Sequence, residues 1–217
     1  IGLISNPNHP QHEMLWKNKE KRKETIKLIR TNVKVTSINQ QVRQTKSNKE
    51  LGINNEIDLN KVSDFLILYK TGYENGFNEK LMNAINILAK KNKIDDLGYE
   101  NIGVIVDDSI SMCGHSNDSK NTPRAIVNFM SKVLEKSTKN SVIVKTEDFY
   151  TDLGSYFIDL LKKENDNVKY DAIFILSDGY ENVYDGLLDE IISIWKEKSK
   201  RKTPVFQISP IISSETN

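Results

Sequence analysis

The chain has 217 residues, which is enough for one domain of ordinary size with an appendage or for two small domains. Its hydrophobic fraction of 37% and charged fraction of 28% allow a buried core. Cys113 is the single cysteine, which excludes an intrachain disulfide and favours a reducing, cytoplasmic compartment. We find no apolar stretch that could span a bilayer and no signal peptide, so we expect no membrane partner. The chain begins at Ile1 rather than Met, which leaves open whether it is a fragment of a longer protein.

The net charge of +1 conceals a basic amino-terminal part. Residues 1–50 contain 11 Lys or Arg and 4 Asp or Glu, so the rest of the chain is acidic. We expect residues 1–58 to form a basic arm that is helical over 11–32 and continues as a polar linker over 33–58. Such an arm either meets a polyanion or an acidic surface, or is simply a solvated helix.

Two further helices are predicted before the first strand. The segment 59–71 has helical character and ends at Gly72, and apolar residues recur at helical spacing through 77–92. We therefore assign residues 59–97 as a helical segment that precedes the main domain.

Strands and helices alternate through the remaining residues, 98–217. The strands are apolar throughout rather than alternately apolar and polar, which is typical of a parallel sheet covered on both faces. The predicted fold class is therefore α/β, a Rossmann-like domain whose mainly parallel central sheet is flanked by helices. The predicted strands are 102–106, 141–144, 172–176 and 204–208, and the predicted helices are 123–136, 154–163 and 184–198.

Oxygen-bearing side chains follow two of these strands. Asp107, Ser109 and Ser111 come directly after the first strand, and Asp178 follows the third. Ligands of open parallel sheets bind beyond the carboxyl ends of the strands, so we expect these side chains to converge. Carboxylates and hydroxyls suit Mg²⁺, Mn²⁺ or Ca²⁺ rather than zinc. The alternative interpretation is that they are ordinary helix-cap and turn residues.

These two motifs resemble a known metal site. The pattern DxSxSM at residues 107–112, with Asp178 and Gly179 downstream, is similar to the metal-ion-dependent adhesion site (MIDAS) of von Willebrand factor A (VWA) domains. The resemblance covers roughly residues 98–212. It implies that two serines and a threonine hold Mg²⁺ directly while the aspartates act through water. It also implies a binding protein rather than an enzyme, since the open metal position accepts an acidic group from a partner.

The resemblance leaves the identity of the threonine open. Thr151 precedes a short predicted helix and resembles the family's threonine, although the glycines usual before it are absent. Thr146 and Thr122 are the alternatives.

Other positions near the motifs depart from the family's pattern or extend it. Asp108 stands where the family usually has an apolar residue, and Ile110 stands where glycine is common. The Asp108 carboxylate either adds negative charge to the site or is solvated. Tyr180 and Glu181 either shape partner specificity or belong to ordinary loop surface.

The helical segment before the first strand carries a second resemblance. Residues 58–97 lead straight into the DxSxSM strand, as the last ring helices of the Ro autoantigen (TROVE) family lead into its carboxyl-terminal VWA domain. That family binds small structured RNAs and the ends of misfolded RNAs. The resemblance implies a ribonucleoprotein component in which residues 59–97 end a helical-repeat domain. The arm residues that would then contact RNA phosphates are Lys17, Lys19, Lys21, Arg22, Lys23, Lys27 and Arg30.

Two other function classes stay open. A VWA domain can serve as a protein-interaction adaptor, as in the partners of MoxR-type ATPases, and bind a protein carboxylate through its metal. The pair Asp107 and Asp108 is also similar to the acidic pair of response-regulator receivers, which are phosphorylated on an aspartate. That family needs a phospho-acceptor aspartate and a later lysine; Asp178 is the strand-end aspartate downstream here, and we find no matching lysine.

Overall fold

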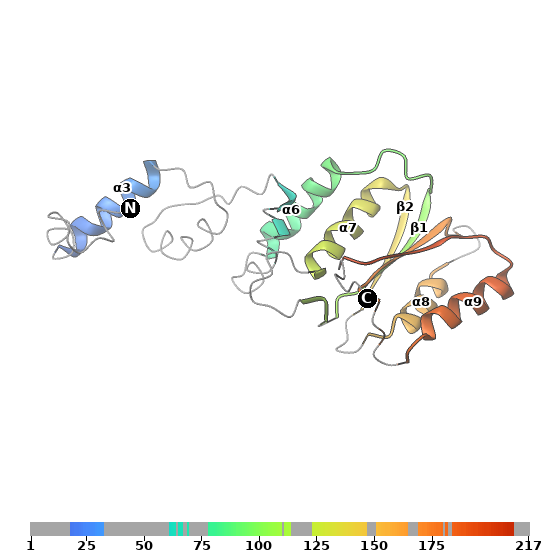
Figure 1. The fold of residues 1–217 in the computed structure, drawn as a ribbon. Coiled ribbons are helices and arrows are strands. Elements are labelled where there is room, and N and C mark those ends of the chain that lie inside the picture. Colours follow the sequence, from blue (N-terminus) through green and yellow to red (C-terminus); the bar gives the residue numbers. More distant parts are fainter. Residues whose placement is uncertain are drawn as a thin grey trace, which may run out of the picture. The chain divides into compact units, whose positions relative to one another are not determined.

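The computed structural model divides into two units, Ile1–Leu59 and Asn60–Asn217, and each is described by itself. In the first unit, helix α3 spans Lys19–Asn32 (Figure 1). The helix predicted there is therefore present, while its expected start and the linker lie outside the described residues. The residues that the structure describes are 18–32, 61–63, 65–66, 69, 78–109, 111–113, 123–146, 151–164, 169–179, 181 and 184–210.

The second unit is built on a four-stranded sheet in the order β2-β1-β3-β4. Every neighbouring pair of strands is parallel; Val104 in β1, for example, lies opposite Ile143 in β2 and Phe174 in β3. This confirms the predicted α/β fold with its parallel sheet. The strands are β1 (Asn101–Val106), β2 (Asn140–Lys145), β3 (Ala172–Leu176) and β4 (Val205–Ile208).

Helices connect the strands and follow the predicted pattern closely. One difference is that α9 begins at Leu187, three residues later than expected, because the backbone turns at Tyr184–Gly186 and Gly186 adopts a positive φ of 79°. The helical elements of this unit whose bounds the structure defines are α6 (Asn78–Lys91), the 3-10 helix η1 (Ser111–Cys113), α7 (Pro123–Ser137), α8 (Leu153–Lys162) and α9 (Leu187–Ser199).

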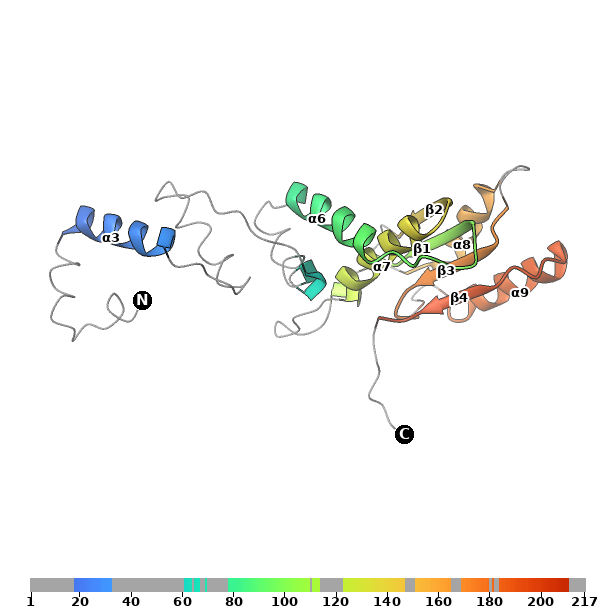
Figure 2. The ribbon, with the colours of Figure 1, turned by 90° about the horizontal axis from the view of Figure 1, so that it is seen from above.

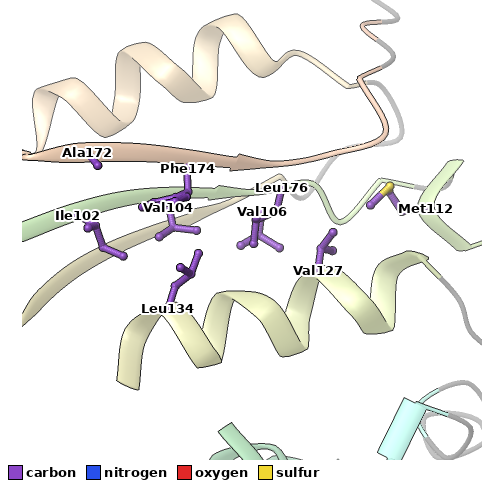
Figure 3. Packing of buried hydrophobic residues seen from close by; sticks show 9 residues of the cluster. All are labelled: Ile102, Val104, Val106, Met112, Val127, Leu134, Ala172, Phe174 and Leu176. Atoms are coloured by element: carbon purple, nitrogen blue, oxygen red, sulfur yellow. The ribbon is translucent and has the colours of Figure 1, made fainter. Parts of the chain in front are cut away.

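The helices cover both faces of the sheet, as Figure 1 shows. On one face, Val127 and Leu134 of α7 point toward apolar side chains of β1 and β3 (Figure 3). On the other face α8 approaches β1 so closely that a Cβ at Gly103 would lie 2.7 Å from Cδ2 of Leu160, so a larger residue there would displace the Leu160 side chain. The buried side chains of this second layer are Ile105, Val144, Leu153, Phe157, Leu160, Tyr170, Ile173, Ile175 and Leu188.

The helical segment before β1 packs on the outer side of α7. Helix α6 lies beside α7 in both ribbon views (Figures 1 and 2). Phe65, from the segment predicted as helix 59–71, is fully buried with its ring 5.9 Å from that of Phe129 in α7. Among the described residues, no helix is long and apolar enough to cross a bilayer.

The order of the strands fixes where a ligand site is expected. From β1 the chain passes through α7 to β2 on one side, and it then returns to β3 on the other side of β1. The carboxyl ends of β1 and β3 therefore flank the point where the strand order reverses, which is where open α/β sheets bind ligands. Both sequence motifs lie at these two strand ends.

Candidate metal centre

Asp107 is the most constrained residue at this edge of the sheet. It is fully buried, and its N–H donates to the carbonyl of Leu176 at 2.9 Å. Its Oδ1 accepts from N of Ser109 at 3.0 Å and from Oγ1 of Thr146 at 3.4 Å. Its Oδ2 accepts from Oγ of Ser177 at 2.7 Å. Donors from three segments thus hold both carboxylate oxygens within the protein.

The two serines of the first motif place their hydroxyls together. Oγ of Ser109 lies 2.9 Å from Oγ of Ser111, and Ser109 is only 1% exposed. The next residue, Met112, is fully buried against the α7 layer, which anchors η1 to the core (Figure 3). Octahedral Mg²⁺ with ligands at about 2.1 Å has neighbouring oxygens about 3 Å apart. The two hydroxyl oxygens therefore already have the spacing of adjacent magnesium ligands.

The second motif reaches the same place through Ser177, the residue directly before Asp178. Besides its bond to Asp107, Oγ of Ser177 accepts from N of Gly179 at 3.0 Å. Gly179 has a φ of +89°, and a Cβ there would lie 2.8 Å from Nε2 of Gln207 in β4. The turn therefore requires glycine, and it holds the partly buried Asp178 one residue from the Asp107 contact. The structure brings the two predicted motifs together.

Thr146, one of the alternative threonines, supports the first motif from β2. It is 1% exposed, and its Oγ1 accepts from N of Asp108 at 2.8 Å while lying 3.4 Å from Oδ1 of Asp107. Its hydroxyl is thus engaged within the protein and braces the loop after β1. The other alternative, Thr122, lies outside the described residues.

Thr151 is placed differently. It is fully buried, yet its Oγ1 has no hydrogen-bond partner within the part of the chain that the structure describes. It precedes Asp152, whose carboxylate caps α8, and Leu153 packs in one cluster with Ile105 and Ile175 near the carboxyl ends of β1 and β3. A buried hydroxyl without a partner costs free energy, roughly 1–3 kcal/mol, which a ligand can recover. The start of α8 therefore presents an unused oxygen at this edge.

Asp108 is bound by two side chains of α7. Its Oδ1 pairs with the Arg124 guanidinium at the start of α7 and accepts from Nδ2 of Asn128 at 3.2 Å. Its negative charge is thus matched by α7, and the carboxylate ties the loop after β1 to that helix.

Lys145, the last residue of β2, contacts one of the polar side chains that surround Asp108. Its Nζ donates to Oδ1 of Asn128 at 2.5 Å. Although the Lys145 side chain is exposed overall, partial desolvation of its ammonium group is the main cause that lowers its pKa below the ordinary value; Asp108 opposes this, and Lys132 and Arg124 lower the pKa further. The ammonium group of Lys145 therefore lies within the electrostatic influence of Asp108, Lys132 and Arg124.

Glu181 shapes the loop after β3. Its Oε2 accepts from N of Leu188 at 3.1 Å, which caps α9 where the N-cap residue Gly186 has no side chain to do so. Its Oε1 is buried without a hydrogen-bond partner in the described part of the chain. Tyr180 lies outside the described residues.

The donor set defines the chemistry that this centre can support. Within the described residues, no group of three or more His, Cys, Asp or Glu side chains could hold a metal ion. The candidate centre instead combines hydroxyls with carboxylates, and the residues described at this edge contribute no imidazole or thiolate to it. Such oxygen donors fit a hard divalent cation, and the uncommitted Thr151 hydroxyl adds a further possible ligand.

Several neighbours of the centre were not identified from the sequence. Ser177 directly precedes Asp178 in the sequence, but its contact with Asp107 depends on strand order. Arg124 lies in the first turn of α7, and Lys145 is the last residue of β2. A parallel sheet therefore places both residues at this edge. Their grouping around Asp108 required the structure.

Comparison of the sequence with protein-family models and with curated proteins gives no match.

Proposed function

We propose that this chain binds a divalent cation, preferably Mg²⁺, at the carboxyl ends of β1 and β3 and uses it to capture an acidic group of a partner. The proposal agrees with the resemblance to VWA domains. Ser109, Ser111 and Thr151 would hold the cation directly, with Asp107 and Asp178 acting through water. When bound, the cation would supply an open position for a carboxylate or phosphate.

The observation that carries this proposal is a set of hydroxyl groups, largely shielded from solvent, that make few hydrogen bonds to the rest of the protein. Ser109 and Ser111 pair with each other, and Thr151 has no partner in the described part of the chain. Interiors normally satisfy such groups, so an exception at a strand switch point favours a ligand site over a purely structural one. Asp107 orients the loop that carries both serines. We infer binding rather than catalysis because the set offers no general base of the histidine type.

The test removes both serine hydroxyls at once. We expect the double variant Ser109→Ala, Ser111→Ala to lose Mg²⁺ and Mn²⁺ affinity by at least about 100-fold in calorimetry, since even groups outside the ligand shell are typically worth 10–100-fold. The free energy of unfolding without metal should change by less than about 1 kcal/mol, because the two hydroxyls bond mainly to each other. Ser193→Ala, which removes an exposed hydroxyl in α9, is the control and should bind normally. Unchanged metal affinity in the double variant would refute the centre.

A second candidate function, RNA binding, belongs to the first unit. Helix α3 carries six basic and two acidic side chains, and Lys19, Lys21, Lys23 and Lys27 are exposed. Excess exposed positive charge on one helix favours contact with phosphates. Lys17 and the side chain of Arg30 lie outside what the structure describes.

A filter-binding titration of a structured RNA tests this second function. We expect affinity to fall as salt rises and to fall further in Lys19→Glu, Lys23→Glu. The matched control, Lys196→Glu, Lys198→Glu, reverses two exposed charges on α9 and should bind RNA nearly as the natural chain does. Binding without a salt slope, or without loss on charge reversal in α3, would exclude an RNA-binding arm.

A further inference from the structure

A positive cluster lies beside the candidate metal centre. Arg124 stands in the first turn of α7, and Lys145 is the last residue of β2. Helix α7 runs from the carboxyl end of β1 back to the start of β2, so both residues lie at the carboxyl edge of the sheet. The amino end of α7 adds partial positive charge at the same place.

The charge of Lys145 exceeds what its described neighbours neutralise. Its ammonium group donates to the amide oxygen of Asn128, which is a neutral acceptor. The carboxylate that attracts it, Asp108, is already paired with Arg124. Lys132, the next cation, is paired with Glu135. One positive charge is thus left at an exposed position, where it can meet an anion from outside the chain.

Short contacts connect this cluster to the metal centre. Asn128 bonds to both Lys145 and Asp108, and N of Asp108 donates to Oγ1 of Thr146 at 2.8 Å. Thr146 in turn lies 3.4 Å from Oδ1 of Asp107. The positive cluster and the hydroxyls therefore border the same loop, the one that follows β1.

We propose that Lys145, supported by Arg124, binds a second acidic group of the captured ligand, so that the centre takes peptides carrying two neighbouring carboxylates. This inference rests on the proposed metal-dependent capture: one carboxylate occupies the cation and the other meets the ammonium group. The pair gives the chain a preference for diacidic segments over single acidic groups.

The charges around the edge favour an acidic peptide over RNA. Asp178, Asp152 and Asp185 lie on the segments that follow β2 and β3, and they would repel a long polyanion. Lys145 contributes a single ammonium group, which suits one carboxylate.

The experiment uses the full chain loaded with Mg²⁺ and two capped peptides, one with a single Glu and one with two adjacent Glu residues. We expect calorimetry to show about 10-fold tighter binding of the diacidic peptide, a typical gain from one added charge pair. Lys145→Met should abolish that preference while leaving Mg²⁺ affinity and binding of the single-Glu peptide unchanged. Lys145→Arg should keep the preference. Lys139→Met, which removes an exposed lysine at the opposite edge, is the matched control.

The outcomes separate this inference from the proposed function. Absence of Mg²⁺ binding would overturn both. Normal Mg²⁺ binding with no capture of either peptide, or a diacidic preference that survives Lys145→Met, would overturn the inference and leave the metal centre standing. Magnesium-dependent binding of an RNA oligonucleotide that is tighter than that of the diacidic peptide and is lost in Lys145→Met would assign the subsite to phosphate instead.

Discussion

The two ends of the sheet in the second unit treat their polar side chains differently. At the amino end, Oδ2 of Asp171 accepts from N of Glu100 at 3.1 Å and from N of Asn101 at 2.9 Å. Nδ2 of Asn140 donates to Oδ1 of Asn101 at 2.8 Å, which links β2 to β1. These groups bond to one another across strands, so they serve the fold.

A second group near the amino end of β3 is equally complete. Glu164 accepts two hydrogen bonds from Nη1 of Arg201, at 2.7 and 2.6 Å, and a third from N of Tyr170 at 2.9 Å. The hydroxyl of Tyr170 donates to the carbonyl of Leu160 at 3.1 Å. Each of these polar side chains is satisfied within the chain.

The carboxyl end combines a similar framework with groups that lack such partners. Asp107 and Thr146 are bonded as fully as the groups at the amino end, but Ser109 and Ser111 depend on each other. Thr151 has no partner within the described residues. Because stability alone favours satisfying buried polar groups, the difference supports the proposal that this edge binds a ligand.

The most direct test of this difference replaces each of the two threonines with isosteric valine. Thr146→Val should destabilise the metal-free protein by about 2 kcal/mol, because it leaves N of Asp108 without its acceptor and removes a hydroxyl beside Asp107. Thr151→Val should instead stabilise it by about 1 kcal/mol, because a methyl group replaces a buried hydroxyl to which the described residues offer no partner. Urea unfolding without metal measures both changes.

The same two variants also distinguish a threonine that stabilises the loop from one that binds the metal. Mg²⁺ should stabilise the natural chain against urea, and Thr151→Val should lose at least about 10-fold in Mg²⁺ affinity although its metal-free form is more stable. If Thr151→Val destabilised the metal-free chain, or bound Mg²⁺ normally, the two ends of the sheet would not differ in the way described.

Much of the fold could be predicted because its signals are local. Uninterrupted apolar runs such as 172–176 predict strands covered on both faces, and their alternation with helices predicts a parallel sheet. The convergence of Asp107 and Asp178 then followed from the rule that parallel strands end at one edge. The start of α9 was misplaced because Gly186 ends a turn there through its positive φ, which no helical periodicity reveals.

Contacts between distant residues could not be predicted in the same way. The pairing of Asp108 with Arg124 and the bond from Ser177 to Asp107 depend on which strands and helices are neighbours. Sequence alone left Asp108 either as an added charge or as a solvated residue, and it favoured Thr151 over Thr146 and Thr122 only through the resemblance to the family's threonine. The structure distinguishes the two threonines: the hydroxyl of Thr146 is engaged, whereas that of Thr151 has no hydrogen-bond partner among the described residues.

The smallest expected effect concerns Tyr170, one of the satisfied polar side chains at the amino end of the sheet. Tyr170→Phe should cost about 1 kcal/mol or less near neutral pH, because the carbonyl of Leu160 keeps its bond from N of Lys163. Burial, and then the charge of Glu164, raises the pKa of Tyr170 to about 12. The neutral phenol therefore stabilises the fold below pH 10, and this contribution is lost as the pH rises toward 12.

Unfolding measured from pH 8 to 12 should accordingly show the stability difference between the natural chain and Tyr170→Phe narrowing across the upper half of that range. Because the amino end takes no part in metal binding, Mg²⁺ affinity at pH 8 should be the same in both proteins. A weaker Mg²⁺ affinity in Tyr170→Phe, matched by no change in Ser193→Ala, would show that the two ends of the sheet are coupled. The polar groups at the amino end would then contribute to Mg²⁺ affinity as well as to stability.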